Sequence, residues 1–121
     1  VTRGAGTRVD LRCPDPAANP YLVLAVCLEA GLDGIRNQIT PPDAVTENVF
    51  EMQLQQRAKL GIESLPGDLE QAVEELEKDD YIKNVLGGHI TEKYLEAKRA
   101  EWADYRAQVT EWEIEKYLYK I

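Results

Sequence analysis

The chain has 121 residues, of which 44% are hydrophobic and 30% charged, and its formal net charge is −8. This length and composition fit one folded unit at most and exclude an intrinsically disordered chain. The acidic charge argues against direct binding to nucleic acid, which needs a basic surface. The longest apolar run, residues 21–28, is far shorter than the roughly 20 residues that span a bilayer, so no membrane association is expected.

The cysteines bear on the compartment. Cys13 and Cys27 lie in or beside apolar stretches and lack the spacing of metal ligands. Both are interpreted as buried thiols, which suits a reducing compartment. The first residues also lack the basic and then apolar pattern of a secretion signal. The chain is therefore expected to be cytoplasmic.

Residues 1–19 differ in character from the rest of the chain. Val1–Gly6 contains two glycines and no periodicity, which indicates a loop, whereas Thr7–Cys13 alternates polar and apolar residues, as a half-buried strand does. A strand needs neighbours for its backbone donors and acceptors, and the sequence offers no second convincing strand. The missing partners are expected in another chain or in sequence beyond this one, so the chain is interpreted as a segment of a larger protein.

The next two regions are a helix and a long connection. Asn19 followed by Pro20 reads as an N-cap with proline at the first helical position, and it predicts a helix over residues 20–38. This helix is apolar on nearly every face through Leu28, which is typical of a helix buried inside a larger body. Residues 39–67 are predicted to form a long loop, with a helical turn or two near residues 53–60.

Residues 68–121 are predicted to form a helical subdomain. Asp68 caps a helix with apolar residues at i, i+3, i+4 and i+7, and Asp79 or Asp80 starts a short helix that ends at the glycine pair 87–88. Thr91 is predicted to open a long helix, and Thr110 with Glu113 forms a capping box for the last one. The predicted fold class is therefore mainly α, with one or two N-terminal β-strands. The acidic residues between positions 74 and 80 are interpreted as solvated helix surface.

The chemistry-bearing pattern lies on the predicted strand. Residues two apart share a face of a strand, so Arg8, Asp10 and Arg12 are expected to point the same way. Such a row is either a salt-bridged solvent face, worth little in stability, or a site that holds an anionic substrate and a metal together. Alternation alone favours the solvent face.

The surrounding residues change this interpretation. Arg3–Leu22 reads RGAGTRVDLRCPDPAANPYL and closely resembles the segment RGAGTRVELRSPDPAANPYL of glutamine synthetases. The resemblance covers nearly the whole chain and continues, in order, through Ala30–Ile35, Leu65–Leu69, Leu86–His89, Lys98–Trp102 and Tyr105–Glu113. The later blocks are similar to type I enzymes of Gram-positive bacteria. On this resemblance, residues 1–121 are the C-terminal portion of the α+β glutamine synthetase catalytic domain.

The resemblance implies an ATP-dependent ligase that joins glutamate and ammonia through a γ-glutamyl phosphate intermediate. The resemblance implies that Asp10 is a ligand of a divalent cation, which would be Mg²⁺ or, alternatively, Mn²⁺. Arg8 would bind the ATP phosphates, and Arg12 would bind glutamate and act catalytically on the transferred phosphoryl group. These roles match the general needs of phosphoryl transfer, in which metals and arginines offset the charge on the moving group.

Two positions depart from the family pattern. The family usually has glutamate at position 10, and aspartate is shorter by one methylene, about 1.3 Å of reach with carbon–carbon bonds near 1.5 Å. Phe50 lies where another subdivision of the family carries an adenylylated tyrosine. Without a hydroxyl that modification is impossible, so Phe50 is interpreted as an anchor that ties its loop to the body of the protein.

The resemblance also implies what this chain lacks. The family's other metal ligands, its flap and most of its nucleotide pocket lie upstream, so the isolated chain is expected to be inactive. Its partners would be the remainder of the chain, the other subunits of a homo-oligomeric dodecamer and, through the C-terminal region, a transcriptional repressor. Two alternatives stay open: a γ-glutamyl-amine ligase of the same family, and a helical regulatory interaction module formed by residues 68–121.

Overall fold

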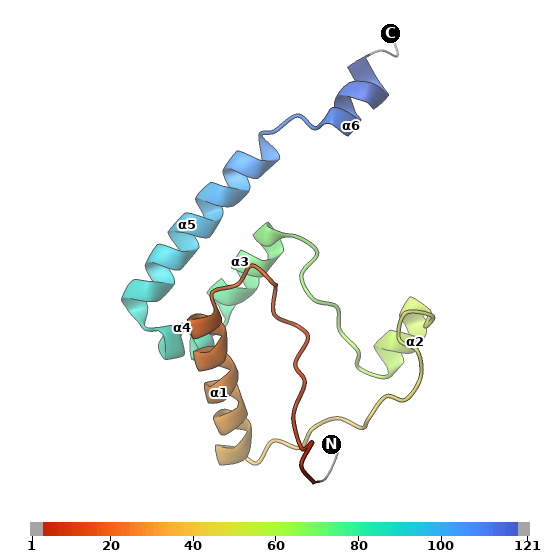
Figure 1. Ribbon diagram of the computed structural model, residues 1–121, viewed down its shortest axis with the longest axis vertical. Helices are drawn as coiled ribbons and strands as arrows, with labels where there is room; N and C mark the ends of the chain where they lie inside the picture. Colours follow the sequence, from red (N-terminus) through yellow and green to blue (C-terminus); the bar gives the residue numbers. More distant parts are fainter. Residues whose placement is uncertain (1–3, 119–121) are drawn as a thin grey trace. The chain divides into compact units, whose positions relative to one another are not determined.

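The computed structural model describes residues 4–118, and all the regular elements in this part of the chain are helices (Figure 1). The helices are α1 (Pro20–Arg36), α2 (Leu54–Lys59), α3 (Leu69–Lys78), α4 (Asp80–Leu86), α5 (Gly88–Arg106), α6 (Glu111–Glu113) and the π-helix η1 (Ile114–Leu118). They fall into two units, Val1–Leu65 and Pro66–Ile121. The mainly helical fold class is confirmed. No described helix is both long and apolar enough to cross a membrane.

The N-terminal strand is the exception to this agreement. Residues 7–13 form no strand in the structure, and no strand occurs anywhere else between residues 4 and 118. Strand pairing needs a second backbone at hydrogen-bonding distance, and the described chain offers none beside this segment. Cys13 is accordingly exposed, and Cys27 is only half-buried, so the interpretation of both as buried thiols is wrong for this chain.

Helix α1 begins where the sequence predicts and ends two residues earlier. The Asn19 side chain accepts hydrogen bonds from the backbone amides of Tyr21 and Leu22, at 3.0 and 3.3 Å, and Pro20 occupies the first turn. The helix ends at Arg36 because Gln38 adopts a positive φ of 52°. None of its residues is buried, and among the described helices none packs on it. Its apolar faces are therefore open in this chain, and their burial inside a larger body stays a prediction.

The connection between α1 and α3 contains one short helix, α2, within the range where a helical turn was predicted. Before it, the Asn48 side chain accepts from the Phe50 amide and donates to Glu51, which closes a tight turn over the buried Met52. Phe50 itself is 100% exposed at this turn. The predicted anchoring of Phe50 is therefore not made by any described part of this chain.

In the second unit, α3 and α5 pack against each other and α4 connects them (Figure 1). The caps predicted at Asp68 and Asp79 are both formed: each carboxylate accepts an amide hydrogen bond, at 2.8 and 3.0 Å. Gly87, with a φ of 79°, permits the reversal from α4 into α5, which begins at Gly88 rather than at Thr91. Thr91 is instead buried, and its hydroxyl donates to the Lys83 carbonyl oxygen.

Val73 is the buried apolar residue of α3, where it faces α5. Replacing it with alanine is expected to lower the free energy of unfolding of this unit by about 1–2 kcal/mol, because two buried methyl groups are lost. Val109 is 72% exposed, so Val109→Ala serves as the matched control and should change stability by less than about 0.5 kcal/mol. Urea unfolding followed by helical circular dichroism measures both, and equal effects would contradict the packing of α3 on α5.

The last helical segment starts at the capping box that the sequence predicts. Thr110 accepts from the Glu113 amide at 3.2 Å, while the Glu113 carboxylate accepts from the Thr110 amide and hydroxyl, both at 2.8 Å. The backbone amide is the main cause that holds the pKa of Glu113 below its ordinary value, and the hydroxyl adds to it. The ionised carboxylate therefore stabilises this helix start.

The pH dependence of this cap has a definite sign. Because the folded pKa of Glu113 is lowered, its stabilisation is full above the ordinary glutamate pKa of 4.5 and is lost as the pH falls through the folded pKa. A carboxyl NMR titration should place the pKa of Glu113 below its ordinary value. Thr110→Ala should move it only part of the way back, since the backbone amide remains. A Glu113 pKa at or above 4.5 would show that the box is not formed in solution.

Candidate functional site

Arg8 and Asp10 lie together, as the alternation of residues 7–13 predicts, although no strand forms there. The Arg8 Nε donates to both carboxylate oxygens of Asp10, at 3.2 and 3.3 Å. The two side chains are 70% and 55% exposed, so the pair is open to solvent and contributes little to stability. Because the segment is open to solvent, the Asp10 carboxylate remains able to bind a cation and the Arg8 guanidinium an anion.

Arg12 completes the predicted row in sequence but not in contacts. It is exposed, and no hydrogen bond or ion pair within residues 4–118 links it to Arg8 or Asp10. The described chain also contains no cluster of three or more metal-binding side chains. Of the predicted site residues, this chain therefore brings together Arg8 and Asp10 and leaves Arg12 open.

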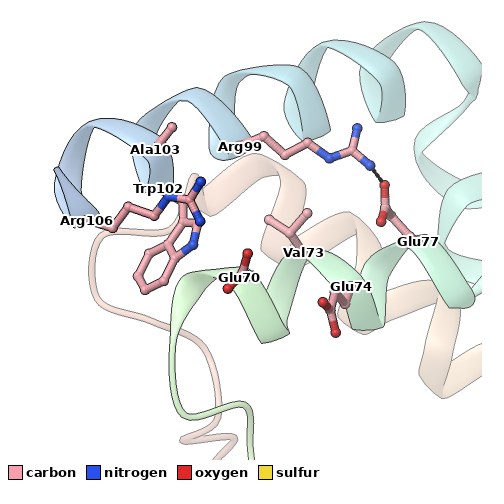
Figure 2. Close-up of a pocket in the computed structure, with 8 residues that line it drawn as sticks. All are labelled: Glu70, Val73, Glu74, Glu77, Arg99, Trp102, Ala103 and Arg106. Carbon is pink, nitrogen blue, oxygen red and sulfur yellow. Dashed lines mark ion pairs between the residues drawn. The ribbon is translucent and has the colours of Figure 1, made fainter.

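A second candidate site lies between two helices of the C-terminal unit. A hollow of about 280 Å³ opens between α3 and α5 (Figure 2). Its α3 side carries carboxylates and its α5 side carries guanidinium groups around an indole; the lining residues are Glu70, Val73, Glu74, Glu77, Arg99, Trp102, Ala103 and Arg106. Hereafter this space is called the α3–α5 hollow.

One end of the hollow is closed by an ion pair between Glu77 and Arg99, drawn as a dashed line in Figure 2. Nearby, the Lys83 ammonium donates to the Glu77 backbone carbonyl at 2.6 Å and pairs with Asp80 at 2.7 Å. The hydrogen bond with Lys83 holds the pKa of Asp80 below its ordinary value. This end of the hollow is therefore fixed by contacts from α3, α4 and α5.

The hollow was missed in the sequence because its signal spans two helices. Residues 70, 73, 74 and 77 share one face of α3, and residues 99, 102, 103 and 106 share one face of α5. From the sequence, the acidic residues between positions 74 and 80 are interpreted only as solvated helix surface, without a partner on α5. Glu70 and Glu77 on α3 have the same spacing as Arg99 and Arg106 on α5. Comparing the two helices therefore indicates that these faces lie opposite each other.

Comparison with known proteins shows that nearly the whole chain matches one protein family. Residues 1–117 match the family described as "Glutamine synthetase, catalytic domain". A glutamine synthetase of Clostridium saccharobutylicum is 52% identical over 99% of this chain and 27% of its own length, and one of Thermotoga maritima is 52% identical over 97% and 27%. A solved structure of GmaS, in its apo form without ligand, superposes with a TM-score of 0.74 at 42% identity, covering 89% of this chain and 24% of that one.

The chain thus spans about a quarter of the length of these relatives. At such identity over almost all of the chain, shared ancestry accounts for the sequence from the Arg8–Asp10 segment to the capping box at Thr110. The chain belongs to the glutamine synthetase catalytic-domain family.

Proposed function

We propose that the full-length protein is a glutamate–ammonia ligase, and that this chain supplies one wall of its active site. The observation that carries the proposal is the identity of about one half to proteins named glutamine synthetase across nearly the entire chain. The reaction would first move the γ-phosphoryl group of ATP to the side-chain carboxylate of glutamate. Ammonia would then attack the carbonyl carbon and release phosphate, leaving glutamine.

The residues of the N-terminal segment suit this chemistry. Arg12, which is exposed and makes no hydrogen bond or ion pair within the described chain, would bind glutamate and offset the charge of the transferred phosphoryl group. Arg8 would bind the ATP phosphates through the guanidinium that here contacts Asp10. We further propose that residues 7–13 become a strand when the rest of the catalytic domain supplies the neighbouring backbone.

Asp10 fits a divalent cation in part. Mg²⁺ in phosphoryl-transfer sites uses one or two protein carboxylates with water and substrate phosphates, and Asp10 offers one such carboxylate. The cation would supply charge neutralisation at the phosphates, and the remaining ligands would come from elsewhere in the full-length protein. Asp10 lies against Arg8, so the groups proposed to bind the cation and the phosphates would be adjacent.

The proposal extends to partners and location. The isolated chain would be inactive, because it carries about a quarter of the relatives' length and one short row of site residues. The full-length protein would assemble as a dodecamer and act in the cytoplasm. Its C-terminal region would contact a transcriptional repressor, for which the exposed Trp112 and Tyr117 offer aromatic contact surface.

The test is phosphate release by the full-length protein with glutamate, ATP and Mg²⁺, with and without ammonia. Release that depends on ammonia is the expected result. Release that needs methylamine or ethylamine instead would make the protein a γ-glutamyl-amine ligase, and release independent of any amine would overturn the ligase proposal altogether.

A further inference from the structure

The α3–α5 hollow has two ends that match in sequence but differ in contacts. Glu77 and Glu70 are two turns apart on α3, and Arg99 and Arg106 are two turns apart on α5. Glu77 is paired with Arg99. At the other end, no ion pair within the described chain joins Glu70 to Arg106, although both line the same space. The hollow therefore has one closed ion pair and one open pair of opposite charges.

The space between the open charges is amphipathic. Figure 2 shows the Arg106 side chain, the Trp102 indole and Ala103 at this end of α5, with Glu70 across from them on α3 and Val73 nearer the middle. The Trp102 ring also stacks on Tyr105, with centroids 5.8 Å apart, which holds the indole in place. Opposite charges separated by an apolar floor select a molecule that carries both charges and a short carbon chain.

Two further features indicate that the open end of the hollow lacks a ligand group. The indole Nε1 of Trp102 is buried and has no hydrogen-bond partner within the described chain, so this end lacks an acceptor. A carboxylate entering beside Arg106 could supply that acceptor after a small shift of the side chains that cover the indole. Across the hollow, Glu74 adds a second carboxylate one turn from Glu70, which favours an ammonium group on the α3 side.

We propose that the α3–α5 hollow binds a small zwitterion, an amino acid with a free ammonium and a free carboxylate. Its carboxylate lies against Arg106 and the Trp102 indole, its ammonium lies between Glu70 and Glu74, and its carbon chain covers Val73 and Ala103. This site is separate from the row of Arg8, Asp10 and Arg12 in sequence and in chemistry. It is independent of the proposed ligase reaction.

The test uses calorimetric titration of the full-length protein, without ATP, with glycine, β-alanine and 4-aminobutyrate. These zwitterions differ in the distance between their charges, so the tightest binder reports the span between Glu70 and Arg106. Propionate and propylamine, which keep one charge each, should bind at least about tenfold more weakly than the best zwitterion, as expected when a charge-assisted hydrogen bond is lost. Equal binding of either would overturn the proposal.

Variants separate this site from any binding at the proposed active site. Zwitterion binding at the hollow should persist in Arg12→Ala and weaken about tenfold in Glu70→Gln and in Arg106→Gln. Glu92→Gln and Arg36→Gln, which change exposed charges outside the hollow, are the matched controls and should leave the affinity unchanged. Binding that disappears in Arg12→Ala, or that ignores Glu70→Gln and Arg106→Gln, would place the ligand elsewhere.

Exchanging the charges at positions 70 and 106 distinguishes a specific loss of ligand binding from a loss caused by misfolding. The single reversals Glu70→Arg and Arg106→Glu should each abolish binding, because two like charges then face the ligand. The double variant Glu70→Arg with Arg106→Glu should regain part of the binding, since a zwitterion can enter in the reverse orientation, while the unchanged Glu74 and Trp102 N–H keep the recovery incomplete. If the double variant binds no better than the single reversals while its helical circular dichroism is unchanged, the proposal fails. Absence of any binding to the wild-type protein outside the Arg12-dependent site would also overturn it.

Discussion

Replacing Arg12 with alanine in the full-length protein is expected to slow ammonia-dependent phosphate release by about 10²–10³-fold, the usual effect of removing one donor that stabilises charge in the transition state. Arg12 is exposed and makes no hydrogen bond or ion pair within the described chain, so its loss should disturb the fold little. The effect should appear mainly in kcat, with a smaller rise in KM for glutamate.

The controls for Arg12 come from the same unit. Arg12→Lys keeps the charge but loses the planar pair of donors, so it should recover only part of the rate. Arg36→Ala removes an exposed arginine that pairs with Glu29 on α1, and it should leave the rate unchanged. If Arg12→Ala keeps the wild-type rate, or if Arg36→Ala loses as much, the proposed role of Arg12 is wrong.

The features that the sequence predicts well depend on neighbours a few residues away. The helix starts at Pro20, Leu69 and Asp80 follow from caps whose side chains bond amides two or three residues ahead. The pairing of Arg8 with Asp10 is equally local. It needs the alternation of side chains along the backbone and not the pairing of strands.

The features that the sequence predicts poorly depend on distant partners. The strand at residues 7–13 and the burial of α1 both need surfaces that the described chain does not supply, so neither forms in it. The sequence predicts the start of α5 at Thr91 because threonine is a common cap, but α5 begins at Gly88 and the buried Thr91 hydroxyl donates to the Lys83 carbonyl oxygen instead. The α3–α5 hollow forms only because two helix faces pack against each other, and the residue periodicity within one helix does not show which other helix it packs on.

Asp10 is expected to set the Mg²⁺ requirement of the full-length protein. Asp10→Asn keeps the size of the side chain and removes its charge, so the Mg²⁺ concentration for half-maximal phosphate release should rise by at least about tenfold. The variant also loses the ion pair with Arg8, but that pair is exposed and contributes little to stability. A thermal unfolding midpoint close to that of the wild type would confirm that the effect is on the site.

Asp10→Glu separates a direct ligand from a nearby charge. Restoring the longer side chain that the family usually carries extends the carboxylate by about 1.3 Å. Mg²⁺ demands near-ideal octahedral geometry, so a directly bound aspartate requires a backbone already placed closer to the cation, and glutamate would then disturb the site and raise the Mg²⁺ requirement. If a water molecule bridges Asp10 and the cation, glutamate should displace it and lower the requirement. An Asp10→Glu and an Asp10→Asn variant that both keep the wild-type Mg²⁺ dependence would show that Asp10 does not serve the cation, leaving the salt-bridged solvent face as the correct interpretation of this residue.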